Sequence, residues 1–212
     1  MLYLVGDVLQ PIYGPFRLFT SHIFLAGASI VLTSALTWLL LPFFASRLPQ
    51  DKGREFAVGK TAAVGKPTSA GVIFVLVYVT VALITVPWHL IHSAILGAVV
   101  LAMCGGFLDD RANLSEYWLA AIDFGIALLS AFALCGSVDT EIWLPFVKDF
   151  VIPPRWVCVA GSTALLWIAI NATNCTDGVD GLSGSLSVIA LTTLGGLLYF
   201  VVGDDKVAAY LL

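Results

Sequence analysis

The stretch Asn171-Ala172-Thr173-Asn174-Cys175-Thr176-Asp177-Gly178-Val179-Asp180-Gly181-Leu182 gathers two amides, two carboxylates and two glycines between long apolar runs. A bilayer tolerates such a cluster only where it faces a cavity or an aqueous surface. A glycine follows each aspartate, so we expect a tight turn that presents both carboxylates and bare backbone N–H groups to a ligand. Paired carboxylates suit Mg²⁺ and, through it, phosphate. An ordinary surface turn is the alternative interpretation.

The composition of the whole chain is that of a membrane protein. Of its 212 residues, 59% are hydrophobic and 11% are charged, and the mean hydropathy is +0.98. Soluble domains carry roughly 25% charged residues, more than twice this fraction. The net charge of −4 is small and scattered, which argues against a nucleic-acid partner.

Six apolar runs predict an all-α, polytopic transmembrane helical bundle that forms a single integral membrane domain over residues 1–212. A helix needs about 20 residues to cross the hydrocarbon of a bilayer. Residues 1–19 are expected to form a short interfacial lead-in. The predicted spans are residues 22–44, 71–86, 93–108, 117–135, 156–170 and 186–202.

The distribution of basic residues predicts the orientation of the bundle. Residues 45–69 hold Arg47, Lys52, Arg54, Lys60 and Lys66, half of the chain's 10 basic residues. The positive-inside rule places this loop in the cytoplasm and the N-terminus outside. With alternating spans, the loop, the pair Asp109-Asp110 and the polar stretch described above all reach the cytoplasmic face.

Four carboxylates are therefore expected at one face, namely Asp109, Asp110, Asp177 and Asp180. Carboxylates held together repel one another unless a cation binds or one of them is protonated. A divalent metal ion resolves this repulsion most simply. Taken alone, the Asp109-Asp110 dipeptide would be only a solvated helix end.

The segment Lys66-Pro67-Thr68-Ser69-Ala70-Gly71 opens the second predicted span. It offers a positive charge, two hydroxyl groups and the N–H groups of a helix start, all of which attract anions. A helix cap beside a positive-inside lysine is the simpler alternative. On the same face as the carboxylates, the segment indicates the phosphate side of a metal–diphosphate site.

The motifs together resemble those of a known enzyme family. Gly106-Phe107-Leu108-Asp109-Asp110, Asn174-x-Thr176-Asp177-Gly178-x-Asp180-Gly181-Leu182 and Pro67-Thr68-x-x-Gly71 occur in polyprenyl-phosphate N-acetylaminosugar-1-phosphate transferases. The lead-in Tyr13-Gly14-Pro15-Phe16-Arg17-Leu18-Phe19 is similar to the muramoyl-pentapeptide branch of that family. The resemblance covers essentially the whole chain.

The resemblance implies a reaction and its partners. The enzyme would transfer phospho-N-acetylmuramoyl-pentapeptide from its UDP-linked precursor to undecaprenyl phosphate with Mg²⁺, releasing UMP, in peptidoglycan (lipid I) synthesis. It would lie in the bacterial cytoplasmic (inner) membrane, with its active site on the cytoplasmic face. The family also suggests a homodimer.

The resemblance further assigns roles to individual residues. Asp109, Asp110 and Asp177 are expected to be catalytic and to bind the metal ion, with one residue of the aspartate pair activating the lipid phosphate. The expected substrate-binding residues are Lys66, Thr68, Asn171, Asn174 and Asp180. The chemistry is phosphoryl transfer, in which positioning and charge neutralisation supply most of the catalysis.

The chain departs from the family pattern in three ways. Ser69-Ala70 stands where the muramoyl branch usually has Met-Gly, and Arg111-Ala112-Asn113-Leu114 lacks the family's lysine after the aspartate pair. These departures bear on which nucleotide sugar is used, and Arg111 can supply the missing charge. Family members have about ten spans, a Gly-Asp-x-Gly-Ser segment and a late histidine cluster. We therefore expect a fragment or truncated product that is inactive alone.

Three alternatives stay open at this point. A UDP-N-acetylglucosamine:undecaprenyl-phosphate GlcNAc-1-phosphate transferase shares the aspartate pair and the Asn-Asp-Gly stretch. A cation-coupled transporter would use Asp177 and Asp180 as ion ligands, and it predicts acids near the middle of the membrane. A membrane scaffold without enzymatic activity would need none of the clustered carboxylates.

Overall fold

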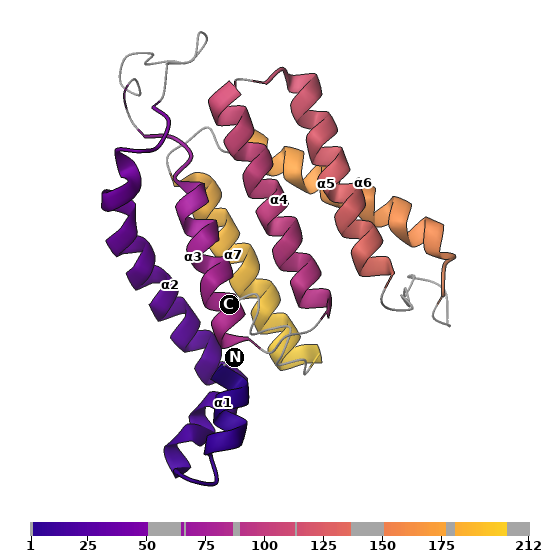
Figure 1. The fold of residues 1–212 in the computed structure, drawn as a ribbon. Coiled ribbons are helices and arrows are strands. Elements are labelled where there is room, and N and C mark those ends of the chain that lie inside the picture. Colours follow the sequence, from indigo (N-terminus) through magenta and orange to yellow (C-terminus); the bar gives the residue numbers. More distant parts are fainter. Residues whose placement is uncertain are drawn as a thin grey trace. The chain divides into compact units, whose positions relative to one another are not determined.

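The computed structural model describes residues 2–50, 65, 67–86, 90–112, 114–136, 151–176 and 181–202. Most of the described residues are in helices, as expected for an all-α bundle (Figure 1). One isolated antiparallel bridge joins Gln50 and Pro67. The described part divides into two compact units, residues 1–88 with 184–212 and residues 89–183.

All six predicted spans are helices. They are α2 (His22–Ala45), α3 (Gly71–Thr85), α4 (Leu90–Ala112), α5 (Glu116–Cys135), α6 (Arg155–Thr176) and α7 (Leu182–Leu197), which a short π-helix, η2 (Leu198–Val202), extends. Every one except α3 is long and apolar enough to cross a membrane. The 15 residues of α3 rise only about 22 Å, less than the hydrocarbon thickness of about 30 Å.

In the first unit, α2 and α3 pack along their lengths (Figure 1). The buried stripe Ile73, Val77 and Val81 recurs every four residues on one face of α3, which is the spacing of a helix face. Against this stripe lie partly buried side chains from α2 and the residues after it, namely Leu36, Leu40, Leu41, Phe44 and Leu48. At the other end of the pair, the Ser29 hydroxyl donates to Thr85 Oγ1 at 2.9 Å.

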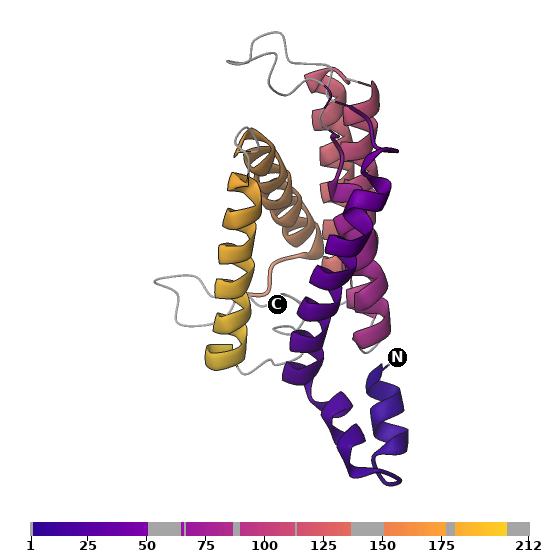
Figure 2. The same cartoon turned by 90° about the vertical axis from the view of Figure 1, so that its left-hand side faces the viewer.

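The N-terminal lead-in is helical rather than irregular. The helix α1 (Leu2–Leu9) lies beside the 3₁₀ helix η1 (Gly14–Thr20) at the start of α2 (Figure 2). The two approach closely at Gly6, where an added Cβ would lie 2.7 Å from Phe19 Cβ. Glycine is therefore required at position 6 for this contact.

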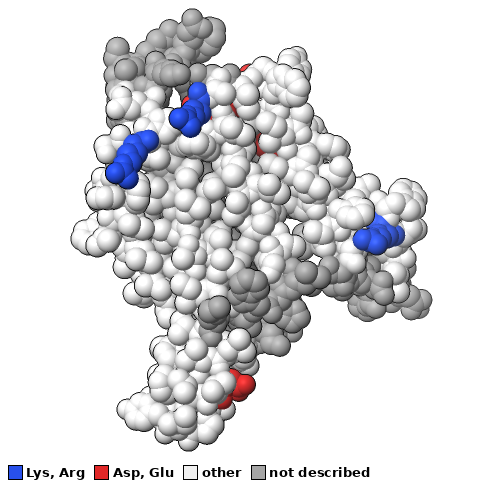
Figure 3. All heavy atoms as spheres, in the orientation of Figure 1, with Lys and Arg blue, Asp and Glu red and all other residues white. Residues whose placement is uncertain are grey.

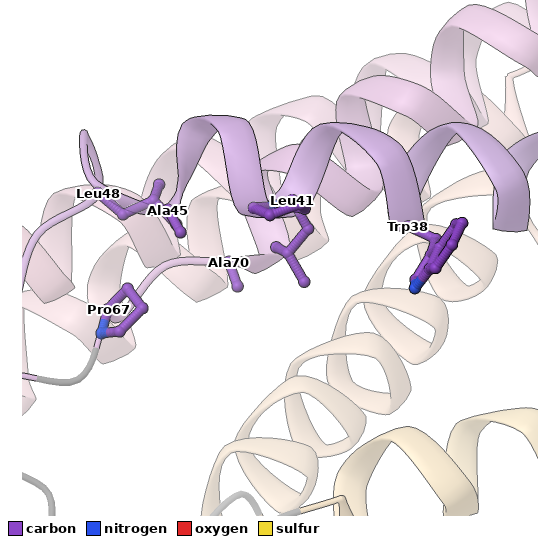
Figure 4. A pocket seen from close by; sticks show the side chains of 7 residues that line it. Trp38, Leu41, Ala45, Leu48, Pro67 and Ala70 are labelled. Atoms are coloured by element: carbon purple, nitrogen blue, oxygen red, sulfur yellow. The ribbon is translucent and has the colours of Figure 1, made fainter.

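The first unit also contains an apolar pocket of about 430 Å³ where α2 meets the segment before α3 (Figure 4). Pro42 lies inside α2 here, and one backbone hydrogen bond of the helix is missing because a proline has no N–H to donate to the carbonyl four residues earlier. The residues lining the pocket are Trp38, Leu41, Pro42, Ala45, Leu48, Pro67 and Ala70.

In the second unit, α4 lies beside α5, and α6 crosses α5 (Figure 1). The helices α4 and α5 approach closely at Gly105, where an added Cβ would lie 3.3 Å from Ile122 Cγ2 and 3.4 Å from Ile126 Cδ1. This close approach brings the C-terminal end of α4, which carries the aspartate pair, against the first turns of α5.

Four contacts hold α6 against α5. The Trp167 indole donates from Nε1 to the Ala120 carbonyl at 3.1 Å, and its ring meets Phe124 edge-on at 6.1 Å between centroids. Cys135 Sγ and Ser162 Oγ are 3.5 Å apart. The guanidinium of Arg155, the first residue of α6, stacks on Phe132 at 5.1 Å from the ring centroid. The α5–α6 pairing is thus fixed at several points along both helices.

The outer surface of the described residues is mostly apolar. Many large hydrophobic side chains are exposed, among them Trp38 at 82% and Leu165 at 72%. Figure 3 shows few charged side chains on the face in view. Large exposed apolar surfaces are rare on soluble monomers and are expected where lipid is the solvent. The chain is a multi-pass membrane protein.

Candidate active site

A buried carboxylate lies where α4, α5 and α6 meet. Asp123 is only 6% exposed, although it sits seven residues after Glu116 in a helix apolar enough to cross a membrane. Its Oδ2 accepts a hydrogen bond from Asn174 Nδ2 at 3.5 Å. The helix α4, whose last turn carries Asp109, packs against α5. Asp123 thus contacts Asn174, which the sequence predicted to bind the substrate.

Asp109 lies in the last turn of α4 and is partly buried. Its Oδ1 accepts from the backbone N–H of Leu114 at 3.2 Å, so the carboxylate ties the link between α4 and α5 to the helix end. The span predicted to end at residue 108 therefore continues as helix through Ala112. Negative charge at a helix C-terminus is unfavourable, so the aspartates gain nothing from the helix dipole at this position.

Asp110 follows on the same turn and is exposed. Successive residues on a helix are rotated by about 100°, so Asp109 and Asp110 point in different directions. Arg111 stacks on Phe107, one turn earlier, with its guanidinium carbon 5.7 Å from the ring centroid. The aspartate pair is therefore accompanied by one cation on its own helix turn.

The polar stretch starts as helix, which corrects the prediction that the fifth span ends at residue 170. The helix α6 continues to Thr176. Asn171 Nδ2 donates to the Trp167 carbonyl at 2.9 Å, and Thr173 Oγ1 donates to the Ala169 carbonyl at 2.8 Å. Because these polar side chains bond to carbonyls of their own helix, they do not terminate it. Gly181, after the helix, has a φ of +78°, as the predicted tight turn requires.

Thr68 lies in the other unit, next to the pocket in Figure 4. Its backbone N–H and its hydroxyl both donate to the Pro49 carbonyl, at 2.8 and 3.1 Å. A phosphate at this position would compete with Pro49 for both donors. The neighbouring Ser69 has a φ of +61°, which is uncommon for any residue other than glycine.

Three predicted site residues, Lys66, Asp177 and Asp180, lie outside the described residues. Of the remaining five, Asp109 and Asp110 lie on α4, and Asn171 and Asn174 lie on α6, both of which pack against α5. Asn174 contacts Asp123 of α5. Thr68 belongs to the unit that does not contain them.

The arrangement supplies oxygen ligands for a hard cation and hydrogen bonds for a polar substrate. Carboxylate oxygens are the ligands that Mg²⁺ prefers, and Asp109 and Asp110 provide them on one helix turn. Among the described residues, no three His, Cys, Asp or Glu side chains lie close enough together to hold a metal ion. The third predicted carboxylate, that of Asp177, is not among those residues.

Asp123 was not predicted from the sequence. It could have been, because a single ionisable residue inside a membrane-crossing run marks a functional site by default. In the run of residues 117–135 it is the one acidic or basic side chain, and the high hydropathy of its neighbours obscured it.

Comparisons with known proteins show which family the chain resembles. The model of the family described as glycosyl transferase family 4 matches residues 92–212, which include Asp109, Asp123 and Asn174. The chain is 42% identical to a phospho-N-acetylmuramoyl-pentapeptide-transferase of Treponema pallidum, over 98% of this chain and 59% of that protein. Proteins of the same name from Nautilia profundicola and Aquifex aeolicus are 31% and 25% identical, over 68% and 100% of this chain and 44% and 63% of their own lengths.

The chain thus spans about three fifths of the length of its relative from Treponema pallidum. The family match extends over more than half of the chain and includes the helices that bring Asp109, Asp123 and Asn174 together. The chain belongs to glycosyl transferase family 4.

Proposed function

We propose that this chain is part of a membrane enzyme that transfers phospho-N-acetylmuramoyl-pentapeptide from its UDP-linked precursor to undecaprenyl phosphate and releases UMP. The observation that carries the proposal is the 42% identity, over 98% of this chain, to a protein named for that transfer. The carboxylate and amide groups at the meeting of α4, α5 and α6 support it, because phosphoryl transfer depends on positioning and charge neutralisation.

We assign the aspartate pair to the reacting phosphates. Asp109 and Asp110 stand at the end of an apolar helix, where a membrane lipid can bring its phosphate to the surface. Asn171 and Asn174, with Asp180, bind the nucleotide sugar in this proposal, and Lys66 and Thr68 bind its diphosphate.

We further propose that Asp109, Asp110 and Asp177 hold Mg²⁺. The ion would neutralise the negative charge of the diphosphate and of the leaving nucleotide. The hard oxygen ligands suit it, and their mutual repulsion is relieved by a divalent cation. Chelation with EDTA should therefore abolish UMP release, and added Mg²⁺ should restore it. Full activity in the presence of EDTA would contradict the Mg²⁺ assignment.

The location proposed for the enzyme is the bacterial cytoplasmic membrane, with the site on its cytoplasmic face. Half of the basic residues lie between positions 45 and 69, and the positive-inside rule therefore supports this orientation. A homodimer is the assembly we propose by family resemblance.

One observation supports the transporter alternative. Asp123 lies about 10 Å from the start of α5, inside an apolar span. A transporter, however, does not require the aspartate pair at the end of α4, and the relatives are named as transferases. The transferase therefore accounts for more of the site.

The test is a comparison of nucleotide sugars. Membranes that carry the product of the complete gene are given undecaprenyl phosphate with either UDP-N-acetylmuramoyl-pentapeptide or UDP-N-acetylglucosamine, and UMP is measured. We expect UMP from the muramoyl donor and little from the other. The reverse preference would establish the GlcNAc-1-phosphate transferase instead, and UMP from neither donor would refute both.

A further inference from the structure

The stability of the fold alone does not explain why the carboxylate of Asp123 is buried. It is 94% buried, as its exposed fraction of 6% shows, and the helix around it is apolar. Burying a carboxylate costs free energy that only good hydrogen bonds or an opposite charge can offset. An apolar residue of similar volume would avoid that cost.

The neighbours of Asp123 offset this cost only in part. One is the amide of Asn174, which donates at 3.5 Å, a long distance for a hydrogen bond. The other is Asp109, whose like charge is repulsive. Since one partner is weak and the other is unfavourable, Asp123 is better explained by a role in the site than by a contribution to stability.

The contact is also not needed to pair α5 with α6. The Trp167 indole, its edge-on contact with Phe124 and the Cys135–Ser162 pair already fix that pairing. Asn174 lies beyond them, in the last turn of α6, and its side chain is exposed. The hydrogen bond to Asp123 therefore acts on that last turn and on the orientation of one amide group.

The orientation of this amide matters chemically. The terminal torsion of an asparagine side chain is broad and roughly two-fold, so the amide does not fix its own direction. A carboxylate can only accept, so Asp123 selects the orientation in which the NH₂ group faces inward. The amide oxygen of Asn174 is then directed away from Asp123.

We propose that Asp123 is a positioning residue. By accepting from Asn174, it fixes the amide and the last turn of α6 relative to Asp109, and this raises the affinity of the site for the nucleotide sugar. The proposal rests on the proposed function, because Asn174 is assigned there to substrate binding.

The first experiment separates the hydrogen bond from the charge. Asp123→Leu removes both, whereas Asp123→Asn keeps an acceptor oxygen and removes the charge. In membranes carrying the product of the complete gene, we expect Asp123→Leu to raise KM for the UDP-sugar about 10-fold with little change in kcat, from the loss of a hydrogen bond. Asp123→Asn should restore most of the affinity.

The matched control is Ser130→Ala on the same helix. The Ser130 hydroxyl donates only to the Ile126 carbonyl of its own turn, at 2.7 Å, so its removal should leave KM and kcat unchanged. An unchanged KM in Asp123→Leu, with an active wild type, would overturn the inference. So would an Asp123→Asn variant as impaired as Asp123→Leu.

A double-mutant cycle tests whether Asp123 acts through Asn174. If it does, Asp123→Leu combined with Asn174→Ala should raise KM no more than the larger single effect, because both substitutions remove the same contact. If the double variant instead raised KM by the product of the two single effects, the two residues would act independently and the inference would fail.

Hydrogen–deuterium exchange provides a readout that does not require activity. In Asp123→Leu, the backbone amides of residues 172–176 should exchange faster, because the last turn of α6 opens more readily, while residues 157–170 keep their wild-type rates. Unchanged exchange at residues 172–176 would overturn the inference even if the wild type released no UMP. Absence of UMP from the wild type, by contrast, would count against the proposed function alone.

Discussion

Several hydroxyl groups inside the apolar helices are satisfied locally. Hydroxyl groups of Thr80, Ser130, Thr163 and Thr193 each donate to the carbonyl four residues earlier, at 2.7 Å. Lipid offers no alternative hydrogen-bonding partner, so such bonds keep a polar residue compatible with a membrane helix. Among the described residues, contacts between side-chain polar atoms of different helices are few, and those that exist mark places where helix packing is specific.

The hydroxyl pair of Ser29 and Thr85 is one such place. Thr85 is 1% exposed, donates to the Val81 carbonyl at 2.8 Å and accepts from Ser29. We expect Thr85→Val to lower the free energy of unfolding by about 0.6–1.7 kcal/mol, the range measured for hydrogen bonds between membrane helices. Thr80→Val is the control, because the Thr80 hydroxyl bonds only within its own helix. Denaturant titration in detergent measures both, and equal losses would contradict the assignment.

Ser69 allows a second prediction at this scale. Its φ of +61° lies in the left-handed region, which a β-branched residue occupies only at considerable cost. We expect Ser69→Val to lower the thermal unfolding temperature and Ser69→Asn to be tolerated, since asparagine adopts this conformation more readily. If the two variants melted together, the segment before α3 would not have this backbone conformation.

At the scale of helices, the site depends on the close approach of α4 and α5. Gly105 faces Ile122 and Ile126 at distances that leave no room for a larger side chain, whereas an added Cβ at Gly106 would have no neighbour within 4 Å. The two adjacent glycines therefore differ in role. Only the first sets the distance between the helices that carry Asp109 and Asp123.

Gly105→Val should push α4 away from α5, at a cost of about 1–3 kcal/mol in stability, and should also reduce transferase turnover. Gly106→Val has the same intrinsic effect on helix propensity but meets open space, so it is the matched control. Unfolding in detergent and UMP release measure the two effects. Equal behaviour of the two variants would show that the α4–α5 contact does not position the site.

The helices were predictable from sequence because each depends on a local property. A run of about 20 apolar residues must become a helix to satisfy its backbone in lipid, and α2, α4, α5, α6 and α7 follow this rule. The ends were less predictable. The fifth span was predicted to end at residue 170, but the side chains of Asn171 and Thr173 bond to carbonyls of their own helix and allow α6 to continue.

At the scale of the whole molecule, the chemistry was predictable in kind but not in arrangement. The motif residues Asp109 and Asn174 were expected to share a face; they lie on two helices that both pack against α5, and Asn174 contacts Asp123 of that helix. That connection joins residues 51 positions apart and depends on how α5 packs between its neighbours, which no local pattern encodes. Lys66, Asp177 and Asp180 lie outside the described residues, and their roles stay predictions.

The most direct test of the account is the rate of UMP release from UDP-N-acetylmuramoyl-pentapeptide and undecaprenyl phosphate, measured in membranes carrying the product of the complete gene. Asp109→Asn, Asp110→Asn and Asp177→Asn should each lower the rate roughly 10²-fold or more, because a positioned charge is lost from a phosphoryl-transfer site. Ser130→Ala should retain the wild-type rate. Wild-type turnover in all three aspartate variants would contradict the assignment of this site.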